Sequence, residues 1–370
     1  MGHKDQNDIK NYIMKALLSK ENSLILRGLA IMFIMLHNFL HNPSLGFSQE
    51  NEMSFSSEKA HHFFNVLADG GVNAYELFSF LGWVGVPVFV FLTGYGISKV
   101  APPSNLQSRA AYVKSKYLKL LLLLLPAILI YMLKDILHAE FLSNIYKRIV
   151  YLTMMANVAY PWVNCPPGVY WYFGLTFQFY LIYCFCGDFL KGKVLFIGSL
   201  LSIMGVAVLS LWGSPNALSV YMHCFTGWFP IFAIGIWVGG IKNDQHSLLV
   251  SHNLVLELAV FLFSASLVLL MNRWMSSWLF VSIIALIMFV SAGLLVLRSG
   301  VLANAFKWIG GLSACIFVCH PIARFLINGF VRKQVDSLIL VVLAYVALTF
   351  VLAIAYNKLY KRLLLWVKAK

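Results

Sequence analysis

Apolar positions along the chain are gathered in long blocks, separated by shorter polar segments. A helix needs ~20 consecutive apolar residues to cross the hydrocarbon core of a bilayer. Blocks of about that length recur from residue 24 onwards, so the pattern predicts an all-α, polytopic membrane protein with about ten transmembrane helices. The predicted spans are residues 24–41, 78–98, 118–137, 168–187, 194–212, 219–241, 252–271, 277–297, 306–328 and 337–357.

The first block, LILRGLAIMFIMLHNFLH (24–41), carries ionisable side chains. On a helix, Arg27 and His37 lie about 15 Å apart along the axis, and His41 lies one turn beyond His37 on the same face. Ionisable groups at membrane depth are costly and are functional candidates by default, and an imidazole suits acid–base chemistry near neutral pH. A core histidine that is hydrogen-bonded to a neighbouring helix explains His37 equally well.

Composition agrees with a membrane protein. Apolar residues make up 60% of the chain and charged residues 11%, whereas soluble domains have about 45–50% and 25%. The net charge of +14 is therefore not read as nucleic-acid binding, because basic residues of membrane proteins gather in cytoplasmic loops. With both termini inside, 20 of the 28 Lys and Arg residues fall on the inner side and 8 on the outer side, which favours an N-in, C-in topology. We expect a cytoplasmic segment (1–23), one transmembrane domain (24–357) and a basic cytoplasmic tail (358–370).

Further candidates lie in the second, third and fourth spans. In the second span, Thr93 and Tyr95 supply hydroxyls next to several glycines, although small residues there also suit plain helix packing. Lys116 and Lys119 stand at the inner end of the third span, where they suit either the phosphates of an anion or ordinary positive-inside anchoring. In the fourth span, Gln178 is a polar insertion in an aromatic belt that suits interface anchoring or sugar stacking.

A second outer-half histidine, His320, lies in the sequence SACIFVCHP of the ninth span. A metal site built on His37 and His41, with or without His61 and His62, lacks an acidic ligand at a recognisable spacing. We therefore expect no metal.

Several short motifs resemble those of the membrane acyltransferase-3 family, whose members are multi-span bacterial enzymes that acylate cell-surface sugars and related acceptors. Arg27 and His37, with nine residues between them, resemble its basic-x10-His motif, FLTGYGI (91–97) resembles its FFxLSGFxI motif, and Lys116 and Lys119 replace an Arg-x-x-Arg pair. Three further stretches resemble family motifs: WYFGLTFQFYLIY (171–183), FPIFAIGIWVGG (229–240) and LSACIFVCHP (312–321). These motifs follow one another in the family's order and extend through nearly the whole chain.

The resemblance implies an acyltransferase that moves an acyl group, acetyl by default, from a cytoplasmic acyl-CoA to a hydroxyl of a surface polysaccharide or lipid-linked sugar. It implies a catalytic role for His37 and His320 and no resident cofactor, with acyl-CoA as co-substrate. Donor phosphates would bind Arg27, Lys116 and Lys119. The acceptor or the oxyanion would contact four residues: Thr93, Tyr95, Trp171 and Gln178.

The chain departs from the family pattern at its carboxylates. Pro87 and Thr176 stand at or near positions where the family carries acidic residues, so a carboxylate that orients His37 must come from elsewhere. Asp69, Glu76 and Asp135 are the candidates.

The family also implies a location in the bacterial inner membrane and a part in modifying the cell envelope by O-acetylation. The rival reading is a transporter or flippase of a glycan or a small anion. Many such proteins of this size contain an internal repeat, and we find none in the sequence.

Overall fold

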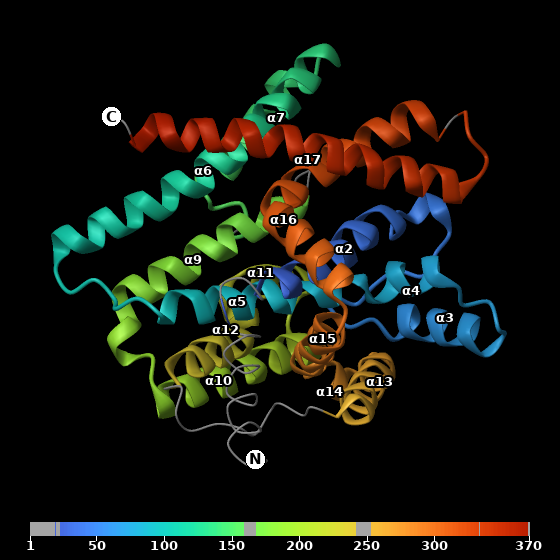
Figure 1. The fold of residues 1–370 in the computed structure, drawn as a ribbon, viewed down its shortest axis with the longest axis horizontal. Helices are drawn as coiled ribbons and strands as arrows, with labels where there is room; N and C mark the ends of the chain where they lie inside the picture. The colour runs from blue at the N-terminus through green and yellow to red at the C-terminus, as the bar shows by residue number, and fades with distance from the viewer. Residues whose placement is uncertain (1–18, 20–22, 159–167, 242–252, 333, 369–370) are drawn as a thin grey trace. The chain divides into compact units, whose positions relative to one another are not determined.

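The computed structural model describes residues 19, 23–158, 168–241, 253–332 and 334–368. Within these ranges, every regular element is a helix (Figure 1), as the sequence predicts. Of the predicted segment 1–23, only Ser19 and Ser23 are described. The α-helices are α2 (Ser23–Leu40), α3 (Ser57–Ala68), α4 (Ala74–Leu81), α5 (Val86–Ser98), α6 (Leu106–Leu137), α7 (Phe141–Leu152), α9 (Trp171–Cys186), α10 (Gly192–Trp212), α11 (Pro215–His223), α12 (Phe225–Gly240), α13 (Leu254–Met271), α14 (Met275–Trp278), α15 (Val281–Leu297), α16 (Gly300–Leu326) and α17 (Leu338–Lys368).

Nine helical segments in the described ranges are long and apolar enough to cross a membrane. The predicted span 277–297 corresponds to α15, an apolar helix of 17 residues. The chain is therefore an all-α, multi-pass membrane protein. The orientation of its termini stays a prediction.

Two segments are more helical than the sequence analysis expected. The basic stretch 99–119 lies almost wholly between the predicted spans 78–98 and 118–137, where a loop is the natural expectation, but α6 begins at Leu106 because Asn105 and Ser108 form a reciprocal capping box there. At the other end of the chain, α17 continues through the predicted tail as far as Lys368, since KLYKRLLLWVK contains good helix formers and no breaker.

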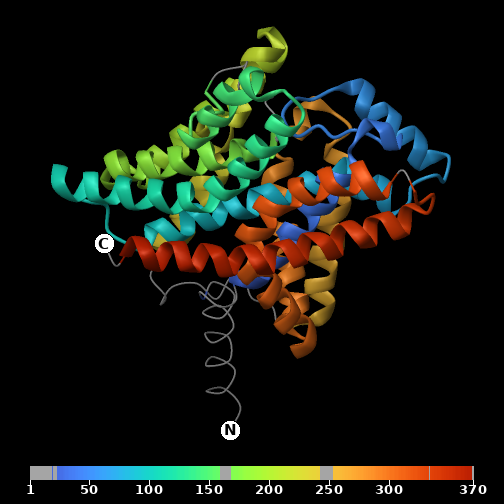
Figure 2. The ribbon, with the colours of Figure 1, turned by 90° about the horizontal axis from the view of Figure 1, so that it is seen from above.

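The described residues within 1–99 and 230–313 form one compact unit, and those within 100–229 and 314–370 form the other. In the first unit, α2 contacts α4, α5 and α15, and α13 lies alongside α15 (Figures 1 and 2). The most hydrophobic windows of α2 and of the segment 74–98 are 67% and 72% buried, against 17% in α13. α2 and α4–α5 are therefore the interior of this unit, and α13 is an outer helix.

The segment 74–98 is not one continuous α-helix. Four residues of 3-10 helix, Gly82–Gly85, separate α4 from α5, and Pro87 lies in the first turn of α5. Gly82 allows this segment to approach α2 closely, since a Cβ atom on Gly82 would lie 2.5 Å from the Cβ of His37. The break therefore brings α4 against the part of α2 that carries the candidate histidine.

In the second unit, α6 contacts α7, α9 and α17, and the contact with α17 can be followed in Figure 2. Pro126 interrupts the hydrogen bonding of α6, where the hydroxyl of Tyr356 lies between two backbone groups. It accepts from the Ala127 N–H at 3.1 Å and donates to the Leu123 carbonyl at 2.7 Å. A side chain from α17 therefore satisfies the groups that the proline-containing turn leaves open.

Candidate active site

His37 lies in the last turn of α2 and is 3% exposed. Its Nδ1 atom is 3.2 Å from the backbone carbonyl oxygen of Phe78, in α4. A carbonyl oxygen only accepts hydrogen bonds, so Nδ1 carries the proton of the neutral ring and Nε2 holds the lone pair. The fold therefore presents His37 as a base through Nε2.

His41 stacks on His37. The ring centroids are 4.7 Å apart, with an angle of 15° between the planes. The Nδ1 atom of His41 lies 3.0 Å from the carbonyl oxygen of His37, so the same argument assigns its lone pair to Nε2. Both imidazoles are thus held in the same tautomer by backbone carbonyl groups.

A carboxylate from the following loop completes this group. One ligand atom from each of His37, His41 and Glu50 lies within 4.8 Å of the other two. The Oε2 atom of Glu50 is buried and has no hydrogen-bond partner within the described ranges. Glu50 is therefore the acidic neighbour of His37, and it is not among the carboxylates that the sequence suggested.

Hydrogen bonds hold the loop on both sides of Glu50. The Ser48 N–H donates to Glu76 Oε2 at 2.9 Å, and the Ser79 hydroxyl donates to the Ser48 carbonyl at 2.7 Å. On the other side, the Trp278 indole N–H donates to the Asn51 carbonyl at 2.6 Å. These contacts come from α4 and α14 and fix the backbone on which Glu50 is placed.

A second carboxyl group, that of Glu52, lies close to Glu50 in the same loop. Burial, together with the charge of Glu50, raises the pKa of Glu52 from its ordinary value of 4.5 to about 8. Glu52 therefore keeps its proton at pH 7 and acts there as a neutral neighbour of Glu50.

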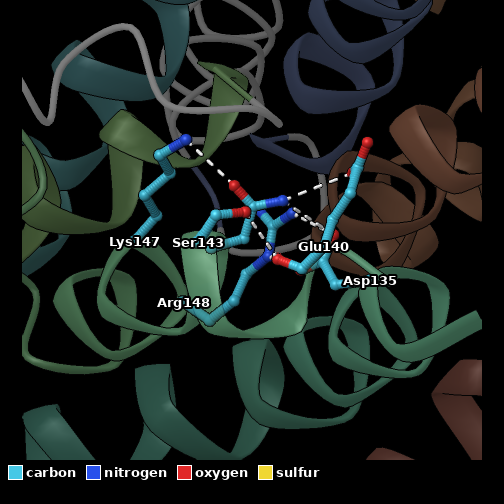
Figure 3. A network of polar contacts seen from close by, with 6 residues as sticks. Asp135, Glu140, Ser143, Lys147 and Arg148 are labelled. Carbon is cyan, nitrogen blue, oxygen red and sulfur yellow. Dashed lines mark hydrogen bonds and ion pairs between the residues drawn. The ribbon is translucent and has the colours of Figure 1, made fainter. Parts of the chain in front are cut away.

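The three acidic residues suggested by the sequence have other contacts. Glu76 accepts the Ser48 N–H, and Asp69 is exposed at the C-terminal cap of α3. Asp135 forms a buried ion pair with Arg148, with Nε–Oδ2 and Nη2–Oδ1 distances of 2.7 and 3.0 Å (Figure 3). This pair joins α6 to α7.

The other candidate residues of the first unit lie on α2 and α5. Arg27 is half-buried on α2, ten residues before His37. The Thr93 hydroxyl donates to the Phe89 carbonyl of its own helix at 2.8 Å. The ammonium group of Lys99 lies 4.8 Å from the centroid of the Tyr95 ring.

The two candidate lysines of the second unit differ in their surroundings. The Nζ atom of Lys116 lies 4.7 Å from the ring centroid of Tyr180 and 5.1 Å from that of Tyr112, so two cation–π contacts hold it. Lys119 is exposed one turn further along α6. Of the two, Lys119 is the accessible cation.

Gln178 takes part in a network that stabilises the break between α11 and α12. Its Oε1 accepts the Phe225 N–H at 2.9 Å, and its Nε2 donates to Asn157 Oδ1 at 3.3 Å. Asn157 in turn donates to the His223 carbonyl at 2.8 Å. Both ends of the Gln178 amide are therefore bound within the second unit.

Trp171 and His320 are both buried in the second unit. Trp171 is 7% exposed and packs edge-on against His223, with ring centroids 5.0 Å apart. His320 is fully buried in α16, where its Nδ1 lies 3.2 Å from the Ile316 carbonyl oxygen. The same tautomer argument leaves the lone pair of His320 on Nε2.

A family model for the acyltransferase domain matches residues 24–358 of the chain. The chain belongs to the acyltransferase-3 family. It is therefore a membrane acyltransferase that transfers groups other than aminoacyl groups, as the motifs predicted. Searches of curated proteins and of solved structures found no match.

Within this acyltransferase, His37 and Arg27 both lie in α2, whereas Glu50 lies in the loop after that helix. The sequence SQENE (48–52) offered two carboxylates nine and eleven residues beyond His41. The spacing of residues in a loop does not reveal the path of the backbone. The two carboxylates therefore could not be assigned to His37 from the sequence.

Proposed function

We propose that this acyltransferase moves an acetyl group from a cytoplasmic acetyl-CoA to a hydroxyl of an extracytoplasmic glycan, with His37 as the general base. The observation that carries the proposal is the bond between His37 Nδ1 and the Phe78 carbonyl oxygen. It leaves Nε2 as the basic atom of a buried ring, and a general base needs that arrangement.

In the proposed reaction, Nε2 of His37 removes the proton of the acceptor hydroxyl while the hydroxyl oxygen attacks the thioester carbonyl carbon. The carbon–sulfur bond then breaks, and the CoA sulfur takes the proton back from the imidazolium. The products are an acetyl ester and free CoA. Proton transfer of this kind contributes about 10²- to 10⁴-fold to a rate.

Glu50 acts in this proposal as a positioning residue. While His37 holds the transferred proton, the ring is a cation in a mostly buried site, and the Glu50 carboxylate within 4.8 Å stabilises it. The raised pKa of Glu52 keeps that neighbour neutral at pH 7.

Donor binding is assigned to the basic residues named from the motifs. With the N-terminus inside, Arg27 lies nearer the cytoplasm than His37 by about 15 Å along α2. Arg27 would then meet the phosphates of CoA, since a guanidinium group binds phosphate oxygens. Lys119, in the second unit, is proposed separately as a donor contact, since an ammonium group also binds phosphate. The location in a bacterial inner membrane and the modification of the cell envelope belong to the same proposal.

The test uses sealed membrane vesicles that contain the protein and its glycan acceptor, with the cytoplasmic face outward. Acetyl-CoA labelled in the acetyl group is added outside, and labelled glycan is measured in the interior. The proposal predicts labelled glycan that depends on the protein. Unlabelled glycan that accumulates inside the vesicles without acetyl transfer would contradict it and would favour a carrier.

A further inference from the structure

The donor atoms of His37, His41 and Glu50 have the composition of a transition-metal site. Two imidazole nitrogens and one carboxylate oxygen lie within 4.8 Å of one another. We propose that these three side chains bind one zinc ion, and that zinc bound there inhibits the acyltransferase. The inhibitory part rests on the proposed role of His37 as base, whereas the binding part does not.

The hydrogen bonds of the two histidines prepare both rings for a metal. A histidine that binds a metal through one nitrogen usually donates its other N–H to a carbonyl or a carboxylate, which fixes the tautomer. His37 donates to the Phe78 carbonyl at 3.2 Å, and His41 donates to the His37 carbonyl at 3.0 Å. Both Nε2 atoms therefore carry lone pairs, and the two rings share one helix face at a spacing of four residues.

Glu50 supplies an anionic ligand. Its Oε2 is buried and makes no hydrogen bond within the described ranges, so a metal replaces no existing contact of that atom. The ammonium group of Lys59 donates to the backbone carbonyl of Glu50 at 2.9 Å. It therefore forms no ion pair with the Glu50 carboxylate.

The donor set favours zinc over the abundant hard cations. Two nitrogens and one oxygen suit Zn²⁺, whereas Mg²⁺ and Ca²⁺ prefer sites made of oxygen alone. Tetrahedral zinc places its ligand atoms about 3.3 Å apart, from bonds of about 2.0–2.2 Å. The three atoms therefore need to draw together by up to about 1.5 Å. Rotation of the Glu50 side chain, which projects from a loop, can supply much of this movement.

Zinc at this position would occupy Nε2 of His37, the atom that takes the acceptor proton in the proposed reaction. Acyl transfer would then stop while the metal is bound and resume when it leaves.

The binding test uses the full chain, purified in detergent without a histidine tag and stripped with a chelator. Zinc is titrated by equilibrium dialysis, and bound metal is measured by atomic emission. We expect one saturable zinc site per chain, which excess Mg²⁺ does not affect. The affinity of this site for zinc should be at least tenfold weaker in His41→Gln and in Glu50→Gln. The matched control is the double variant His61→Gln/His62→Gln, which removes two exposed histidines of α3 and should bind zinc like the unaltered chain.

Loss of the saturable site in the control, or its persistence in both site variants, would overturn the binding proposal. Transfer activity is then measured across the same titration. We expect inhibition with the same half-saturation as binding, reversed by EDTA. Saturable zinc without inhibition would refute His37 as the base and leave the metal site standing. Loss of activity on stripping, restored by zinc, would overturn the inhibitory role.

Discussion

Replacing Glu50 with glutamine tests whether the loop carboxylate supports the base. The change keeps the size of the side chain and removes its charge. In the proposed reaction, the His37 imidazolium then loses an opposite charge that lies no more than 4.8 Å away. Two unit charges at that distance attract by about 3.5 kcal/mol at an effective dielectric constant of ~20.

That energy corresponds to about a 300-fold change in rate. Glu50 is only partly buried, and water weakens the attraction, so we expect kcat to fall by about 30- to 300-fold. The acidic limb of the pH–rate profile should move to lower pH, because protonation of the base loses its stabilising charge. KM for acetyl-CoA should change little, since Glu50 is not assigned to the donor.

The assay measures initial rates of labelled acetyl transfer in membrane vesicles across a pH series. Glu58→Gln is the matched control, because Glu58 is an exposed carboxylate of α3 and its loss should leave the rate unchanged. A Glu50→Gln enzyme with the kcat and pH profile of the control would refute the electrostatic reasoning.

Three further predictions concern stability and donor binding. Arg148→Met should lower the free energy of unfolding by about 3–5 kcal/mol, because the Asp135 carboxylate stays buried without its partner; thermal denaturation in detergent checks this, and a loss no larger than in Lys147→Met would contradict it. Glu52 binds more protons when folded than when unfolded between about pH 4.5 and 8, so stability should fall as pH rises through that window. In Glu52→Gln, the melting temperature should depend less on pH in this window. An unchanged pH dependence of the melting temperature would contradict the prediction. Lys119→Gln should raise KM for acetyl-CoA about fivefold at constant kcat, as expected for one exposed phosphate contact; an unchanged KM would make Lys119 a topology anchor only.

The sequence was sufficient to predict the helices that cross the membrane, because a bilayer requires long apolar runs. It was less informative about where helices begin. Lysines and arginines made residues 99–119 resemble a loop, whereas the capping box at Asn105 and Ser108 begins α6 inside that stretch. Local capping and helix propensity there outweighed the polar composition.

The candidate site divides in the same way. Arg27 and His37 share one helix, so their separation followed from helix geometry. Glu50 lies in a loop whose path depends on contacts distant in the sequence, such as the hydrogen bond from Trp278 to Asn51, 227 residues away. Periodicity carries no information about such contacts, so the sequence pointed to other carboxylates, Asp69, Glu76 and Asp135.

The central claim is that His37 is the general base of acyl transfer. Its most direct test is the initial rate of labelled acetyl transfer by His37→Gln, in vesicles with matched amounts of folded protein. We expect a loss of about 10²- to 10⁴-fold, together with intact insertion in the membrane. A His37→Gln enzyme that transfers acetyl at the rate of the unaltered chain would show that His37 is not the base.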